Sequence, residues 1–206
     1  MSSQSLFPST VVSNVSLTGF SQNGNITWTN PTNVETTNAV YTTAITSTSN
    51  PYSYILTCTN FGFSIPSGST INGISAAIIG HVSITTRGQD LQVSLLKAGT
   101  GVGSNYATLQ GVGITGSTTD VTETYGSGTT DLWGTTWAYT DINSSGFGIG
   151  YEGQSDTSNC TFSIDSVKLT VYYTGGAAGS SLLLTPMNSS NCITPLNSKN
   201  CVVHWF

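Results

Sequence analysis

The chain has 206 residues, of which 37% are hydrophobic but only 6% are charged, and its formal net charge at pH 7 is −5. Because about a quarter of the residues of an ordinary globular protein are charged, Ser, Thr, Asn and Gly must cover most of this surface. The four basic residues (Arg87, Lys97, Lys168 and Lys199) are too few to neutralise several phosphates, which argues strongly against nucleic-acid binding. So little charge also protects weakly against self-association, and we expect a homo-oligomer.

The first residues of the chain lack the basic start and the apolar run, roughly 7–15 residues long, of a secretory signal. No stretch reaches the roughly 18 consecutive apolar residues of a transmembrane helix. We therefore expect synthesis in the cytosol without membrane insertion. Four cysteines (Cys58, Cys160, Cys192 and Cys201) are too few and too widely spread for a disulfide scaffold, and we expect them to be thiols.

In chain order, residues 1–34 contain short β-prone stretches between turn residues, which predicts an N-terminal arm or a first pair of strands. From residue 39 onward the β-prone stretches become regular, and turn residues separate them. The expected strands are 39–45, 52–58, 70–79, 81–85, 91–96, 147–151 and 160–173. This spacing predicts an all-β fold, a jelly-roll-like antiparallel β-sandwich over residues 35–174.

The stretch 160–173 alternates most clearly, and its alternation predicts one buried face that consists of Asp165, Val167, Leu169, Val171 and Tyr173. A carboxylate on that face must find hydrogen-bond donors or a cation. We interpret Asp165 as a structural acid that holds loop N–H groups. A calcium ligand is the alternative.

Residues 175–181 have the Gly/Ala/Ser composition of a flexible linker, and a domain boundary is expected there. Residues 184–192 and 193–201 form a tandem nonapeptide repeat that is identical at six positions. Pro186 and Pro195 exclude a central strand or a helix interior, so residues 182–206 should form an extended arm. An extended arm cannot bury its own apolar side chains, which predicts that it docks on another protein. The expected partner-binding residues are Leu184, Met187, Ile193, Leu196, Trp205 and Phe206.

The sequence lacks the usual catalytic motifs, and its candidate bases are His81 and His204. A glycosidase needs two paired acids, and Glu35, Glu123, Asp131, Asp141 and Glu152 give no pairing by sequence alone. We expect no catalytic residues, no enzyme activity and no cofactor. Cys192, Cys201 and His204 have a metal-like spacing, but both cysteines end a repeat unit, so we predict no metal site. A disulfide between molecules is the alternative role for them.

Five aromatic residues, Tyr125, Trp133, Trp137, Tyr139 and Tyr151, lie in or beside Gly/Thr-rich loops. Exposed rings in such loops would suit glycan binding, whereas buried rings would anchor the loops to the core. Both interpretations stay open, and the exposure of the indoles distinguishes them.

Four stretches, 61–74, 125–137, 141–148 and 164–173, resemble an uncharacterised family of β-sandwich proteins of tailed-phage virions and of bacterial or environmental sequences. They occur over about residues 38–174 in the order that this family shows. The resemblance implies a virion protein, assembled in the host cytoplasm, that contacts itself and other virion proteins. We expect a non-catalytic capsid decoration or a head or tail fibre subunit. The alternative is a carbohydrate-binding or adhesin module that recognises a cell-surface glycan.

Overall fold

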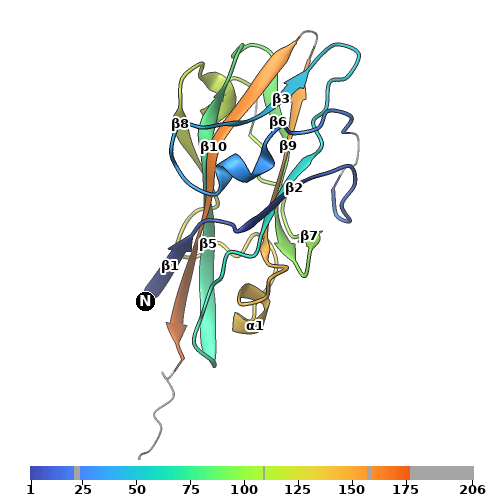
Figure 1. Cartoon of the computed structure of the whole chain (residues 1–206). Coiled ribbons are helices and arrows are strands. Elements are labelled where there is room, and N and C mark those ends of the chain that lie inside the picture. Colours follow the sequence, from blue (N-terminus) through green and yellow to red (C-terminus); the bar gives the residue numbers. More distant parts are fainter. Residues whose placement is uncertain (21–23, 109, 157–158, 177–206) are drawn as a thin grey trace, which may run out of the picture.

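A computed structural model describes residues 1–20, 24–108, 110–156 and 159–176. It confirms the expected antiparallel β-sandwich, which consists of two five-stranded sheets (Figure 1). The first sheet contains β1 (Ser2–Leu6), β10 (Cys160–Gly175), β5 (Ser69–Val82) and β8 (Val121–Tyr125) in that order, and β3 (Thr42–Thr46) also pairs with β10. The second sheet has the order β2 (Thr10–Asn14), β4 (Ile55–Thr59), β9 (Gly148–Ser155), β6 (Gly88–Lys97) and β7 (Thr100–Val102).

Most connections cross from one sheet to the other, because nearly every strand belongs to a different sheet from the strand before it. The exception is the pair β6 and β7, which are neighbours in the second sheet. Three short helical turns complete the described fold: η1 (Pro31–Val34), η2 (Gly113–Gly116) and α1 (Tyr139–Ile142). No helix in the described ranges has the length and apolarity needed to cross a lipid bilayer.

The N-terminal residues are part of both sheets. β1 pairs with β10 in the first sheet, whereas β2 pairs with β4 in the second. Two further strands, β7 and β8, do not correspond to any stretch that the sequence pattern predicts. The expected strand at 81–85 is not separate, because β5 continues through His81 to Val82.

The core lies between the two sheets. Its largest fully buried side chains include Trp28, Trp133, Tyr151, Phe147 and Phe162. The indole N–H groups have acceptors: Trp28 Nε1 donates to the Tyr54 carbonyl at 2.7 Å, and Trp133 Nε1 donates to the Ile74 carbonyl at 2.8 Å. These hydrogen bonds remove the penalty for burying the polar end of each indole.

A smaller apolar cluster covers the outer face of the second sheet. Phe20, Ile55 and Leu96 are buried there, and Leu17 packs against them. The sheet makes room for the Phe20 ring with glycine, since a Cβ at Gly150 would lie 2.4 Å from Phe20 Cζ. Leu17 and Phe20, which follow β2, therefore cover part of this outer face.

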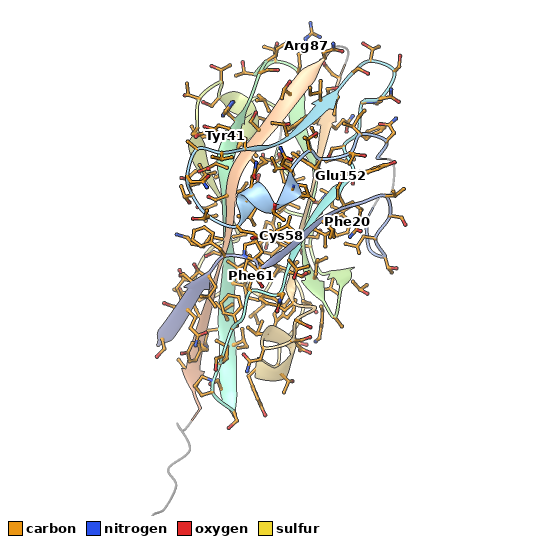
Figure 2. All side chains as sticks on the ribbon, viewed as in Figure 1. Phe20, Tyr41, Cys58, Phe61, Arg87 and Glu152 are labelled. Carbon is orange, nitrogen blue, oxygen red and sulfur yellow. The ribbon has the colours of Figure 1, made fainter. Side chains whose placement is uncertain are left out.

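The start of β1 and the end of β10 lie at the same end of the molecule, because Ser2 is the register partner of Tyr173 (Figure 1). Arg87, in the turn between β5 and β6, lies at the opposite end (Figure 2). The sandwich thus has one end at which β1 begins and β10 ends, and an opposite end that contains the turn between β5 and β6.

Candidate functional site

The most unusual group of side chains is a buried cluster of acids and phenols between the two sheets. Asp90 comes from β6, Glu123 and Tyr125 from β8, and Tyr151 from β9. Glu123 and Tyr125 are two residues apart on one strand, so they project to the same face. Their exposed fractions are 8% and 2%, and Asp90 is only 3% exposed.

A β-bulge turns Asp90 toward this cluster. In the β6–β9 ladder, Asp90 pairs with Gly153 and Gln92 pairs with Glu152, so the register shifts between Asp90 and Gln92. Without the shift, simple alternation would place Asp90 on the same face as Gln92. With it, Asp90 meets the Tyr151 hydroxyl inside the core.

Short hydrogen bonds connect the cluster. Tyr151 Oη donates to Asp90 Oδ1 at 2.7 Å, and Thr108 Oγ1 donates to Asp90 Oδ2 at 2.8 Å. The Tyr125 hydroxyl lies 2.7 Å from Asp90 Oδ2 and 2.9 Å from Glu123 Oε2. The backbone N–H of Ile114 donates to Glu123 Oε2 at 3.0 Å.

Burial changes the acidity of every member of this cluster. It raises the pKa of Asp90, although the hydroxyl donors partly oppose that change. It also raises the pKa of Glu123, to which the nearby charge of Asp90 contributes further. The pKa values of Tyr125 and Tyr151 lie well above their ordinary value, first because of burial and then because of the carboxyl groups. Both phenols are therefore neutral donors.

A second buried acid, Glu152 on β9, lies on the outer face of the second sheet. Glu152 is fully buried, and neither of its carboxyl oxygens has a hydrogen-bond partner among the described residues. Glu152 and Phe20 lie on one side of the sandwich, away from Tyr41 (Figure 2). Desolvation raises the pKa of Glu152 to about 7.

A third polar group lies at the surface of the first sheet. The Tyr41 hydroxyl donates to Asp120 Oδ2 at 2.8 Å, and His81 Nδ1 lies 2.8 Å from Asp120 Oδ1. The Tyr41 and His81 rings meet edge to face, with centroids 5.1 Å apart. Ser163 is the register partner of His81 on β10, but no hydrogen bond joins the two side chains. These two side chains therefore do not form the nucleophile–base contact that a serine hydrolase requires.

The five aromatic residues of the possible glycan site do not form an exposed platform. Trp133 is 0% exposed and Trp137 8%, while Tyr125 and Tyr151 belong to the buried acid cluster. Trp133 packs edge to face on Tyr106, and Trp137 packs in the same way on Phe147. Tyr139 is half-buried. These rings anchor loops to the core, and glycan binding by the four buried rings is incompatible with this structure.

Asp165 holds a loop N–H group, as the sequence predicts for a structural acid: the backbone N–H of Asn38 donates to Asp165 Oδ1 at 3.0 Å. The prediction that Asp165 shares the core-facing side of its strand with Val167 is wrong, however. The β10–β5 register shifts between Ile164 and Ser166, and the buried apolar series passes from Phe162 and Ile164 directly to Val167. Asp165 is the additional residue of a bulge, buried against the loop that precedes β3.

The other acids named as glycosidase candidates do not pair with one another. Asp131 accepts from the Tyr106 hydroxyl and from the backbone N–H groups of Ser127 and Trp133. Burial alone would raise its pKa, but these hydrogen bonds lower it. Asp141 forms an ion pair with Lys97 at 2.7 Å, and Glu35 bridges to Ser166 through its backbone.

Asp90 is the member of the buried cluster that sequence reasoning missed. Glu123 appeared only as one of several unpaired acids, and Tyr125 and Tyr151 only as aromatic candidates. The i, i+2 spacing of Glu123 and Tyr125 is a usable signal for a shared face. No local signal reveals the bulge at Asp90.

No group of three or more His, Cys, Asp or Glu side chains in the described residues is arranged to hold a metal ion. Cys58 and Cys160 are buried thiols, and burial raises the pKa of both. The remaining candidates lie outside the described residues. They are the metal-like set Cys192, Cys201 and His204 and the partner-binding residues Leu184, Met187, Ile193, Leu196, Trp205 and Phe206.

Comparisons with protein-family models, with curated proteins and with solved structures give no match to this chain.

Proposed function

We propose that this protein is a non-catalytic structural component of a tailed-phage particle, a capsid decoration or a head or tail fibre subunit anchored by its C-terminal arm. The observation that carries the proposal is the position from which that arm departs. β10 ends at Gly175, beside the start of β1 and at the end of the sandwich opposite Arg87. Attachment through this end would leave the loops at the other end accessible.

The composition of residues 182–206 supports anchoring. Four of its large apolar side chains, Leu184, Met187, Ile193 and Leu196, occupy matching positions of two proline-containing nonapeptides. An extended chain cannot shelter them by itself, so binding to a second protein would supply the missing apolar contacts. The resemblance of residues 38–174 to sandwich proteins of tailed-phage virions points to other virion proteins as the partners.

The body of the protein supports a structural role as well. Asp90 and Glu123 are buried, His81 contacts Asp120 and Tyr41 at the surface, and Asp131 accepts from loop N–H groups. Charged side chains are scarce, which suits a subunit whose surface is partly covered by neighbours. Glycan recognition by the buried aromatic residues is not part of the proposal.

The decisive experiment is particle association with the arm altered. A chain that ends at Gly176 should keep the folding of the sandwich, measured by circular dichroism and thermal unfolding, but should not sediment with particles. Replacing Leu184, Met187, Ile193 and Leu196 by Ser should have the same effect. Replacing Ser189, Ser190, Ser198 and Asn200 by Ala is the matched control and should leave association intact. Unchanged association of the truncated chain, or absence of the intact chain from every particle fraction, contradicts the proposal.

A further inference from the structure

The buried acid cluster has more short oxygen–oxygen contacts than two ionised carboxylates can explain. The Tyr125 hydroxyl lies within hydrogen-bond distance of both Asp90 Oδ2 and Glu123 Oε2, yet it has a single hydrogen to donate. If both acids were ionised, one of these contacts would bring two lone pairs together in a site shielded from water. The second contact needs a hydrogen that comes from a carboxylic acid.

The donors around each acid show which one carries that hydrogen. Asp90 receives the hydroxyls of Tyr151 and Thr108, and its 2.7 Å contact is the shorter of the two that Tyr125 makes. Several donors to one carboxyl group stabilise its ionised form. Glu123 receives a backbone N–H from Ile114 and also lies beside the Thr108 hydroxyl, whose single hydrogen has Asp90 Oδ2 as its acceptor at 2.8 Å. Its contact with Tyr125 is satisfied when the acid donates to the phenol oxygen.

The charges around the pair favour retention of one proton by the two acids together. No Lys, Arg or His forms an ion pair with either acid among the described residues, so no cation offsets a second negative charge. The titratable groups that face Glu123 are Asp90, Tyr125 and Tyr151. Two like charges this close in a buried site favour retention of one proton by the pair.

The pair also holds the segment that contains η2. Thr108 donates to Asp90, and Ile114 donates to Glu123 through its backbone. Gly113, at φ +59°, lies so close to Glu123 that a Cβ there would be 2.0 Å from the carboxyl carbon. Residues 110–116 thus rest directly on the acid pair, with Val112 49% exposed on their outer side.

We propose that Asp90 and Glu123 share one proton, carried by Glu123, and that this proton keeps residues 110–116 docked on the sandwich. Loss of the proton to a solvent base leaves two carboxylates facing one phenol hydrogen. The Glu123–Tyr125 contact then becomes repulsive, and the 110–116 segment opens. The pH therefore controls whether residues 110–116 are docked on the sandwich beside β8 or open.

The direction of the pH effect follows from the raised pKa of Glu123. The stabilising effect is complete below the pKa of an unfolded-chain Glu, about 4.3. It is lost as the pH rises through the higher pKa of the folded protein. Between these two pKa values the closed protein keeps the proton and the open segment releases it, so the opening constant rises about tenfold per pH unit; above the folded-state pKa it levels off.

The test is hydrogen–deuterium exchange of peptides that cover residues 110–116, measured between pH 5 and pH 9 and corrected for the intrinsic exchange rate. Wild-type protection should fall as the pH rises. In Glu123→Gln the amide N–H₂ replaces the acid as donor to Tyr125 without a charge, so protection should be independent of pH. Asp156→Asn, which removes one surface acid, is the matched control and should behave like the wild type.

Equal pH dependence in Glu123→Gln and the wild type overturns the proposal, as does a wild-type segment whose protection does not change with pH. If Glu123→Gln does not fold, carboxyl carbon NMR of the intact wild-type protein decides. A Glu123 carboxyl group that titrates below its ordinary pKa would also overturn the proposal. These measurements use the isolated protein and do not depend on particle association. The proposed virion role and the proposed shared proton can therefore be refuted independently.

Discussion

Asp90 and Glu152 lie on neighbouring strands of the second sheet, and both are almost completely withdrawn from solvent, but their surroundings differ. Asp90 faces the core, where three hydroxyl groups contact it. Glu152 follows Tyr151 in β9 and therefore faces the opposite side of the sheet, where neither carboxyl oxygen has a partner in the described part of the chain. One acid is integrated into a network, while the other is only buried.

The difference shows that burial alone does not determine what an acid contributes to stability. A buried carboxyl group with several donors organises the structure around it, and its removal leaves those donors unsatisfied. A buried carboxyl group without donors destabilises the fold whenever it is ionised, and its neutral replacement should help.

Asp90→Ala should be the most damaging change. It removes the acceptor of the hydroxyls of Tyr125, Tyr151 and Thr108, and the expected loss in the free energy of unfolding is about 3–5 kcal/mol. Urea unfolding followed by tryptophan fluorescence measures it. Asp120→Ala at the surface is the control, and a loss of similar size there would contradict the role of the buried network.

Glu152→Gln should stabilise the protein at alkaline pH. The folded-state pKa of about 7 lies above the ordinary value of 4.5, so the wild type loses stability as the pH rises through this window. Such a shift corresponds to a gain of about 3 kcal/mol for the variant at pH 8 and to almost none at pH 4. Unfolding curves at the two pH values measure it, and equal effects at both would show that ionisation of Glu152 is not the cause.

Tyr151→Phe removes one hydroxyl donor from Asp90 but keeps the aromatic ring in the core. Hydrogen bonds to charged acceptors contribute more than neutral ones, so the expected loss is about 1.5–2 kcal/mol. Thermal unfolding measures this loss. The matched variant Tyr172→Phe changes a half-buried tyrosine on β10 that is not part of the acid cluster, and it should have little effect.

Lys97→Ala should have the smallest effect. Lys97 pairs with Asp141 at 2.7 Å and lies over the Trp137 ring, 5.6 Å from its centroid, but both charged side chains are partly exposed. The expected loss is about 0.5–1 kcal/mol. It should shrink in high salt because exposed charges are screened, and a loss that does not respond to salt would assign the effect to packing instead.

Much of the fold could be predicted from composition and alternation. Val167, Leu169 and Val171 occupy the buried face that their spacing predicts. The same alternation failed for two acids, because a bulge moves Asp165 off the core face and another bulge turns Asp90 onto it. A bulge depends on how two strands pair across the sheet, and alternation within one strand does not predict that pairing.

Only part of the candidate site could be predicted from the sequence. Glu123 and Tyr125 share a strand, so their spacing indicates a common face. Asp90 and Tyr151 come from different strands, and only the packing of the two sheets brings them to the same place. The aromatic residues show the same limit, since Gly/Thr-rich surroundings predict loops but do not reveal whether the ring of Trp133 is covered.

The amino-acid sequence by itself determined that this protein is an all-β sandwich with few charges and that its final residues contain more apolar side chains than an extended segment can bury. Strand propensity and hydrophobic content are local properties, so they can be read without a structure. Only the tertiary structure decided which acids meet, which remain unpartnered and which rings are hidden. Those outcomes depend on register, bulges and covering loops, which bring together residues far apart in the chain.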